Sequence, residues 1–282
     1  MSTQEQKSKV WFVTGASSGF GRAIVEEAIA RGDRVVATAR APEALADLVA
    51  RAPDRVLAAR LDVTKNAEIR AAVAAAVERF GRIDVLVNNA GYSMVGAVEE
   101  TSDEELRAAL DLMFFGAAAA TREVLPQMRA HKTGVIVQIT SVGGLITAPG
   151  FGAYCAAKHA LEALSESLAA EVAPHGVRVL IVEPGAFRTR LFGGGFRAMP
   201  EIDAYADTVG PTRKYTATSD GTQPGDPVKA ARAITRAVDD PAHPLRLPLG
   251  GDAVDSIRKK LAAVTHDVDA TEAAARATAF DG

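Results

Sequence analysis

Three side chains in the middle of the chain have the types and spacing needed to exchange a proton with a substrate oxygen. Tyr154 and Lys158 are four residues apart, so a helix would carry both on one face. A tyrosine has an ordinary pKa of about 10, and a nearby ammonium group stabilises the phenolate and lowers that pKa. Ser141 lies 13 residues before Tyr154 and can hydrogen-bond the same oxygen as negative charge develops on it. The predicted chemistry is acid–base catalysis at a carbonyl or hydroxyl group.

A glycine-rich turn near the start of the chain could bind phosphate. Residues 14–21 read TGASSGFG, and they join the first apolar strand to the first helix. Glycines there permit a tight turn, and the helix start offers free N–H groups and the positive end of a dipole. The spacing differs from the usual GxGxxG, and an ordinary strand–helix turn is the alternative. The predicted cofactor-binding residues of this turn are Gly15, Ser17, Ser18, Gly19, Phe20 and Gly21.

The end of the second strand predicts which dinucleotide the chain prefers. The strand closes with Thr38-Ala39-Arg40 and has no acidic residue at this point. An acid here would bind the ribose 2′-hydroxyl of NAD, whereas an arginine accommodates the 2′-phosphate of NADP. We therefore predict NADP as the cofactor, with NAD less favoured. The alternative for Arg40 is a solvated surface arginine.

The elements that must position these residues alternate in a regular way. Short β-branched runs are separated by longer helical patterns, which is typical of βαβ units and a parallel sheet. The strands are predicted at residues 10–14, 34–39, 55–61, 84–88, 134–140, 177–183 and, weakly, 245–249. Helices are predicted at residues 20–30, 66–80, 102–130 (with a bend near Gly116) and 152–172. We expect one α/β domain over residues 1–282, a doubly wound, Rossmann-type, mostly parallel seven-stranded sheet with helices on both faces.

Two segments depart from this alternation. Residues 191–227 are rich in Gly, Pro and Thr, with isolated large side chains, and we predict a variable substrate loop there. These large side chains could form a lid over an apolar substrate or anchor the loop to the core. They are Phe192, Phe196, Met199, Tyr205 and Tyr215. Residues 252–282 are charged and alanine-rich, and we predict a tail of two helices.

Taken in order, these motifs resemble the short-chain dehydrogenase/reductase family over residues 10–191. The turn at 14–21 matches the family's TGxxxGxG, residues 88–91 match NNAG, and residues 154–158 match YxxxK. Ser141 stands at the family's usual serine position. The resemblance implies further cofactor contacts besides those of Tyr154 and Lys158, at Asp62, Val63, Asn89, Ala90, Gly91, Pro184, Gly185 and Thr189.

The resemblance also implies an activity and an assembly. A member of this family would be an NADP(H)-dependent oxidoreductase that interconverts a carbonyl and a secondary alcohol by hydride transfer, with Tyr154 as general acid and base. Family members usually form homodimers or homotetramers through the helix at 152–172 and the helix before it. We predict a small, mainly apolar carbonyl or alcohol substrate and a homodimer or homotetramer.

The family pattern breaks at Met113. Many members carry a catalytic Asn three positions before a glycine, here Gly116, and that Asn holds a water that passes protons to the lysine. Methionine is only a weak acceptor and holds a water less well. Two interpretations stay open. Backbone carbonyls or another water could complete a working relay, or the chain is an NAD(P)-binding regulatory or redox-sensing protein with weak catalysis.

Composition excludes several other classes. A net charge of −3 with both signs dispersed leaves no basic footprint for nucleic acid or a membrane surface. Cys155 is the only cysteine and the five histidines are scattered, so we predict no disulfide and no metal site. We read Cys155 as a small buried hydrophobe. The polar start is unlike a signal peptide, and the long apolar stretch at 108–120 is too short to span a bilayer. These features predict a cytoplasmic protein.

Overall fold

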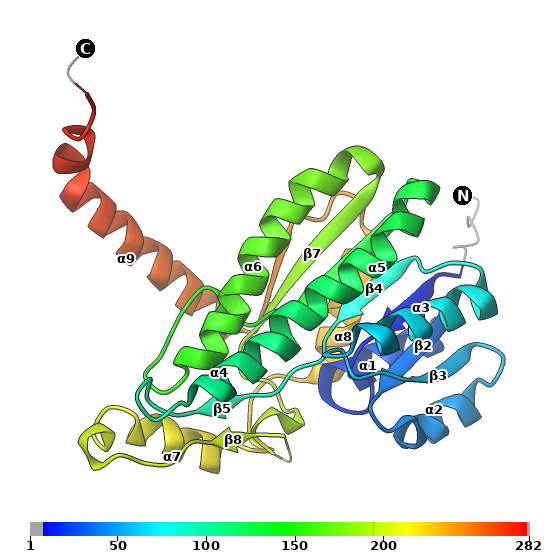
Figure 1. The fold of residues 1–282 in the computed structure, drawn as a ribbon, viewed down its shortest axis with the longest axis horizontal. Coiled ribbons are helices and arrows are strands. Elements are labelled where there is room, and N and C mark those ends of the chain that lie inside the picture. The colour runs from blue at the N-terminus through cyan, green and yellow to red at the C-terminus, as the bar shows by residue number, and fades with distance from the viewer. Residues whose placement is uncertain (1–7, 194, 281–282) are drawn as a thin grey trace.

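A computed structural model describes residues 8–193 and 195–280 of the chain. The parts of the predicted domain, substrate loop and tail that fall on residues 1–7, 194 and 281–282 lie outside the described residues. Seven parallel strands form one sheet in the order β3-β2-β1-β4-β6-β7-β9 (Figure 1). They are β1 (Val10–Val13), β2 (Arg34–Ala39), β3 (Val56–Arg60), β4 (Val85–Asn88), β6 (Gly134–Ile139), β7 (Val177–Pro184) and β9 (Arg246–Leu249). Each predicted strand is present, and its ends move by at most one residue.

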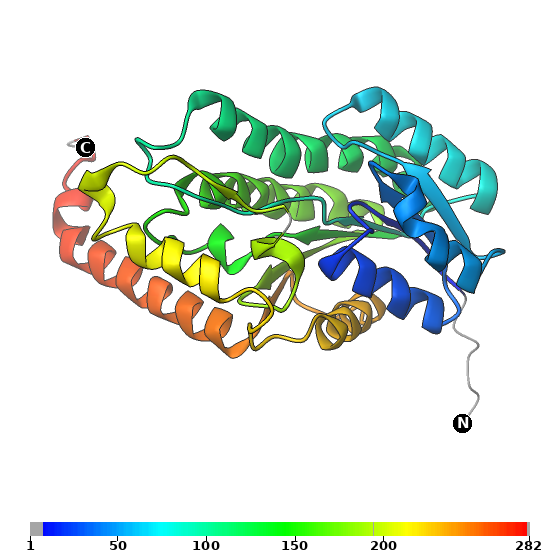
Figure 2. The same cartoon turned by 90° about the horizontal axis from the view of Figure 1, so that it is seen from below.

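Helices cover both faces of this sheet, as the apolar strands require. One face carries α1 (Gly19–Ala30), α2 (Ala46–Arg51) and α8 (Pro227–Asp239). The other carries α3 (Asn66–Phe80), α5 (Gly116–His131) and α6 (Gly152–Val172) (Figure 2). The sequence pattern did not predict α2 or α8. The doubly wound fold, a single Rossmann-like domain, is confirmed.

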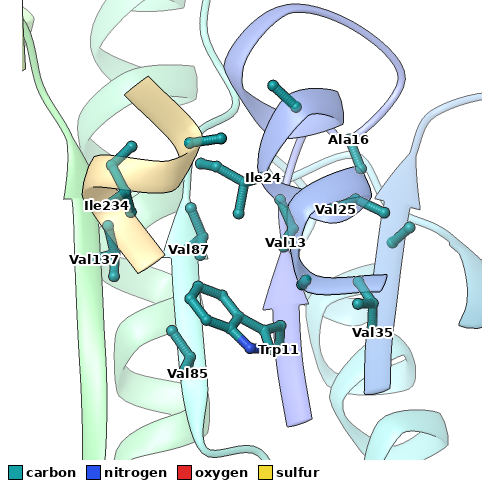
Figure 3. Packing of buried hydrophobic residues seen from close by; sticks show 14 of the residues in the cluster. Trp11, Val13, Ala16, Ile24, Val25, Val35, Val85, Val87, Val137 and Ile234 are labelled. Atoms are coloured by element: carbon teal, nitrogen blue, oxygen red, sulfur yellow. The ribbon is translucent and has the colours of Figure 1, made fainter. Parts of the chain in front are cut away.

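Strand β1, in the interior of the sheet, shows how alternating side chains fill the core on both faces. Successive side chains of a strand point to opposite faces. Trp11 and Val13 therefore pack beneath α1 and α8, where Figure 3 places them with Ile24 and Ile234. The neighbouring Phe12 faces the α3–α5–α6 layer. Every β1 side chain is fully buried.

The strand order reverses between β1 and β4. From β1 the chain runs outward through β2 and β3, and then returns to the other side of β1 through β4, β6 and β7. At such a switch point the loops beyond the carboxyl ends of the strands separate, which leaves a crevice where ligands bind in open α/β sheets. The glycine-rich turn and the segment at 88–91 both follow strands that end there.

The helix predicted at 102–130 is interrupted by a π-helical turn just before Gly116. It consists of α4 (Asp103–Leu110), a π-helical turn at Asp111–Phe115, and α5. Gly116 begins α5 directly after that turn. A glycine is needed at this position because a Cβ would lie 2.8 Å from the Val63 side chain. The π turn brings Met113 into the interior, where its side chain is 1% exposed. π turns of this kind are frequent at functional sites.

Two of the expectations for the irregular segments need correction. The segment 191–227 holds regular structure: β8 (Arg197–Ala198) pairs in parallel with β5 (Met94–Val95), and α7 (Gly210–Thr218) follows. The tail forms one helix, α9 (Gly251–Arg276), and not two. No Gly or Pro occurs from 252 to 276, so nothing in this alanine-rich stretch interrupts the helix.

Candidate functional site

Ser141, Tyr154 and Lys158 meet beyond the carboxyl end of β6. Ser141 follows that strand, and its Oγ accepts a hydrogen bond from the Gly143 N–H at 3.0 Å. Ser141 also lies close enough to Tyr154 to lower the pKa of that tyrosine. One turn along α6, the Lys158 Nζ lies 5.9 Å from the centre of the Tyr154 ring and donates to the Ile139 carbonyl at 2.9 Å. The three groups thus surround one point at the crevice.

Burial dominates the titration of this group. It raises the pKa of Tyr154 to about 12, against a smaller lowering by the hydrogen bond from Ser141. Burial also lowers the pKa of Lys158 to about 8, against the opposite influence of Glu162. The lowered tyrosine pKa expected from the i,i+4 spacing is therefore wrong for this chain, because burial among apolar side chains such as Met113 outweighs the hydrogen bond from Ser141.

The glycine-rich turn is held by hydrogen bonds from the segment after β4. The Thr14 Oγ1 accepts from the backbone N–H of Asn89 at 2.9 Å and of Ala90 at 3.0 Å. The Asn89 side chain donates to the carbonyls of Thr14 at 2.9 Å and Gly15 at 3.1 Å. A Cβ on Gly21 would lie 2.4 Å from the Gly15 oxygen, so only glycine allows this approach. Two adjacent strand ends therefore shape one turn.

The rest of the turn opens toward the crevice. Gly15 and Gly19 have φ values of +65° and +55°, a conformation that favours glycine. Ser17 is exposed, and the Ser18 side chain does not cap α1. Ser18 therefore leaves the first backbone N–H groups of α1 uncapped, and uncapped N–H groups at a helix start are the feature that binds phosphate in proteins.

The segment after β7 folds back over this turn. A Cβ on Gly19 would lie 3.4 Å from the Thr189 Cβ, so the two residues are neighbours. The rings of Phe20 and Phe187 are 5.1 Å apart. Pro184 ends β7, and the Gly185 N–H bonds the Leu249 carbonyl at 2.9 Å. The region at 184–189 therefore forms a wall beside residues 14–21.

Asp252, at the start of α9, supports that wall and was not found from the sequence. Its Oδ2 accepts from the Ala186 N–H at 2.7 Å, and a Cβ on Gly185 would lie 2.3 Å from the same oxygen. Its partner is 66 residues away in the chain, so no local motif marks it. Phe187 was missed for the same reason.

Arg40 and Asp62 lie together at the far side of the crevice. Arg40 is exposed immediately after β2. Burial would raise the pKa of Asp62, but hydrogen bonds from Thr64 and the charges of Lys65 and Arg40 bring it below its ordinary value. Thr64 donates to the Asp62 Oδ1 through its N–H at 3.0 Å and its hydroxyl at 2.7 Å. Val63 is buried next to them.

A buried group of charges stands behind Lys158 on α6, and sequence reasoning missed it too. Glu162 and Glu183 are 3% and 1% exposed, and both pair with Arg246, whose Nη1 lies 2.7 Å from the Glu162 Oε2. Burial raises the pKa of Glu183 to about 7. The charge of Glu162, one helical turn from Lys158, raises the pKa of that lysine.

A small cavity lies between Lys158 and the π turn. Its volume is 10 Å³, close to the space one water occupies. Met113 and Lys158 line it together with Asn88. The Asn88 side-chain nitrogen donates to Thr121 and Gln138 at 3.0 Å, but among the described residues its buried Oδ1 has no hydrogen-bond partner. Gly91 abuts Met113 on the other side.

Comparison with known proteins identifies the family. The family model described as short chain dehydrogenase matches residues 9–198, more than half of the chain. The chain belongs to the short-chain dehydrogenase family. It is an oxidoreductase of that family, and it is 40% identical over 249 residues to the oxidoreductase BOA17 of Botryotinia fuckeliana, covering 88% of this chain and 91% of that protein.

Solved short-chain dehydrogenases share the fold. One from Streptomyces avermitilis has 55% identity and a TM-score of 0.92, over 97% of this chain and 100% of that one. A short-chain dehydrogenase/reductase from Burkholderia phymatum was solved with NAD (26% identity, TM-score 0.78, 89% and 92% covered). An alcohol dehydrogenase from Thermococcus sibiricus was solved with 5-hydroxy-NADP; it has 25% identity and a TM-score of 0.69, over 86% of this chain and 95% of that one.

Residues 8–193 and 195–280 contain neither a membrane-spanning helix nor a cluster of metal ligands. No helix in this part of the chain is long and apolar enough to cross a membrane. No group of three or more His, Cys, Asp or Glu side chains there could hold a metal ion.

Proposed function

We propose that this short-chain dehydrogenase is an NADP(H)-dependent enzyme that interconverts a carbonyl and a secondary alcohol, with Tyr154 as general acid and base. The observation that carries the proposal is the meeting of Ser141, Tyr154 and Lys158 beside the glycine-rich turn. A proton donor, a second hydrogen-bond donor and a cation then lie around one substrate oxygen.

The residues of the crevice suit a phosphorylated dinucleotide. The turn requires glycine at position 21, because a Cβ there would clash with the Gly15 oxygen. Without that side chain, the backbone at the start of α1 is free to approach a pyrophosphate. Exposed Arg40 would pair with the 2′-phosphate of NADP, while Asp62, Ala90 and Thr189 would hold the adenine and nicotinamide halves. When bound, the cofactor supplies or accepts the hydride.

The environment of Tyr154 keeps the phenol in its protonated form. Because burial raises its pKa to about 12, the phenol keeps its proton through neutral pH and can give it to a carbonyl oxygen during reduction. Ser141 donates a second hydrogen bond to that oxygen. The phenolate left behind is stabilised by the protonated Lys158.

The cavity beneath Lys158 supports a working proton relay in place of the usual Asn. Asn88 and Lys158 line the same 10 Å³ space, and the Asn88 Oδ1 has no hydrogen-bond partner among the described residues, so it can accept from a water that Met113 would hold less well. The proton that Tyr154 gives up would return from that water through Lys158. This favours the catalytic interpretation over a regulatory or redox-sensing protein.

The surroundings of Tyr154 point to an apolar substrate. Met94, Met113 and Met199 cluster with the tyrosine, and Met199 comes from the segment 191–227. We assign that segment to the substrate wall, and its aromatic rings also anchor it, since Phe192 stacks edge-on against Phe196 and Tyr215. A homodimer or homotetramer and a cytoplasmic location stay predictions.

The decisive experiment is turnover by Tyr154→Phe. This variant removes only the hydroxyl, so reduction of a panel of apolar ketones, followed by NADPH absorbance, should fall by about 10²- to 10⁴-fold. NADPH binding, measured by fluorescence, should persist. Tyr215→Phe is the matched control: it removes the hydroxyl of a 45% exposed tyrosine but keeps the ring that stacks on Phe192, so it should keep full activity.

Two outcomes would contradict the proposal. Unchanged turnover by Tyr154→Phe would remove the tyrosine from the mechanism. A wild-type protein that binds NADPH but turns over no carbonyl or alcohol in either direction would instead support the regulatory alternative.

A further inference from the structure

Helix α9 begins against the body of the molecule and then leaves it. Ala253 is buried and Val254 and Ile257 are partly covered, whereas every described residue after Ile257 is exposed. The helix contacts β9 and the turn at 142–144, and Figure 1 shows its far end projecting away from the sheet. At about 1.5 Å per residue, its 26 residues span about 39 Å. Most of that length has no cover from its own chain.

The projecting part of α9 carries an apolar stripe. Leu261, Val264 and Val268 are 59%, 43% and 58% exposed, and they continue the line of Val254 and Ile257. The five residues are separated by three, four, three and four positions. This is the a/d spacing of a heptad repeat, with a period of roughly 3.5 residues, which keeps a stripe facing a second helix along its length.

We propose that this stripe packs against α9 of a second copy of the chain, antiparallel to it. The charges beside the stripe complement one another in that arrangement. In the heptad that has Leu261 at a and Val264 at d, Lys260 and Asp267 both occupy position g. Antiparallel helices bring g opposite g, so a register with Leu261 facing Val264 of the second copy sets Lys260 beside Asp267 of that copy. Twofold symmetry forms the pair twice.

The parallel arrangement lacks this complementarity. Parallel helices bring g opposite e of the next heptad, which places Asp267 against Glu272 of the second copy and leaves Lys260 facing Thr265. Like charges at these positions disfavour the pairing. The contact is additional to the one predicted through α6, and it does not depend on the catalytic proposal.

The first test places a charge in the stripe of the full-length chain. Leu261→Glu should raise the dissociation constant of the α9 contact more than about tenfold, because the Leu side chain would no longer be buried between two helices. Sedimentation velocity over a concentration series measures this constant. Ala263→Glu, on the far side of the same helix, is the matched control and should leave it unchanged. An unchanged assembly in Leu261→Glu would overturn the proposal.

The second test fixes the orientation. Lys260→Asp and Asp267→Lys should each raise the dissociation constant about fivefold, and the double variant should restore it. Lys259→Asp makes the same charge change at an outward position and should have no effect. If Asp267→Lys instead tightened the assembly, the helices would pair in parallel, since the new lysine would meet Glu272, and the antiparallel proposal would fail.

Discussion

The proposed cofactor edge (residues 14–21 and 88–91) and the proposed substrate segment (residues 191–227) are held in different ways. At the cofactor edge, Asn89 donates hydrogen bonds to Thr14 at the adjacent strand end, and glycines make room for them. The substrate segment instead depends on Glu100, whose carboxylate oxygens accept from the Ile202 N–H at 2.8 Å and pair with Arg213 at 2.6 Å.

The difference separates geometry that the backbone demands from geometry that side chains distant in the sequence help to supply. At the cofactor edge a changed residue type disturbs a conformation that only that type allows. In the substrate segment the β5–β8 pairing and the aromatic rings would remain if the Glu100 contacts were lost, so the chain would loosen only in part. We therefore expect changes at the cofactor edge to act on cofactor binding strongly, and changes in the substrate segment to act on substrate affinity mildly.

Gly21→Ala should give the largest effect. The added Cβ would lie 2.4 Å from the Gly15 oxygen and 2.5 Å from the Asn89 Nδ2, so the turn must shift. Overpacking of this kind costs about 1–3 kcal/mol of unfolding free energy, and we expect NADPH affinity to fall about 100-fold. Urea unfolding and NADPH fluorescence titration measure the two quantities.

The control for that variant is Gly251→Ala. Gly251 lies at the start of α9 with no atom within 4 Å of an added Cβ, so the variant should bind NADPH like the wild type. If Gly21→Ala bound the cofactor equally well, backbone demand at the cofactor edge would not be the reason for its glycines.

The same contrast explains what the sequence could predict. Strand positions follow from apolar runs, and the cofactor edge follows from residue types whose reason is local. Asp252 and Glu100 could not be found, because each accepts a hydrogen bond from a backbone N–H far away in the sequence. The distance is 66 residues for Asp252 and 102 residues for Glu100. The single helix of the tail was missed although its cause, the lack of any Gly or Pro, was visible. The raised pKa of Tyr154 was missed because it depends on burial and not on spacing.

Arg40→Ala tests whether the exposed arginine sets cofactor preference. A charge-assisted hydrogen bond to a phosphate contributes about 2 kcal/mol, so NADPH affinity should fall about 30-fold while NADH affinity stays constant. Binding constants for both cofactors check this. Arg129→Ala, an exposed arginine in the last turn of α5, controls for loss of charge alone. Equal losses for NADPH and NADH would contradict a 2′-phosphate contact.

Glu100→Gln tests the charged anchor of the substrate segment. The glutamine keeps the size of the side chain but loses the charge that Arg213 and the Ala97 N–H share. The segment should loosen, so KM for the carbonyl substrate should rise about fivefold with NADPH affinity unchanged. Glu104→Gln, at an exposed position on α4, should change neither. A loss of NADPH affinity in Glu100→Gln would show that the two regions are not independent.

The smallest expected effect concerns Lys158, which serves both regions. Its pKa of about 8 means that the ammonium loses its proton as pH rises through that value, and the phenolate left by Tyr154 then lacks its cation. The rate of carbonyl reduction should therefore decline above about pH 8. Glu162 raises the pKa of Lys158, so Glu162→Gln should move the midpoint of that decline to lower pH, by less than about one unit. Glu171→Gln, exposed on the same helix, should leave it in place. A shift to higher pH in Glu162→Gln would mean that another group controls the profile.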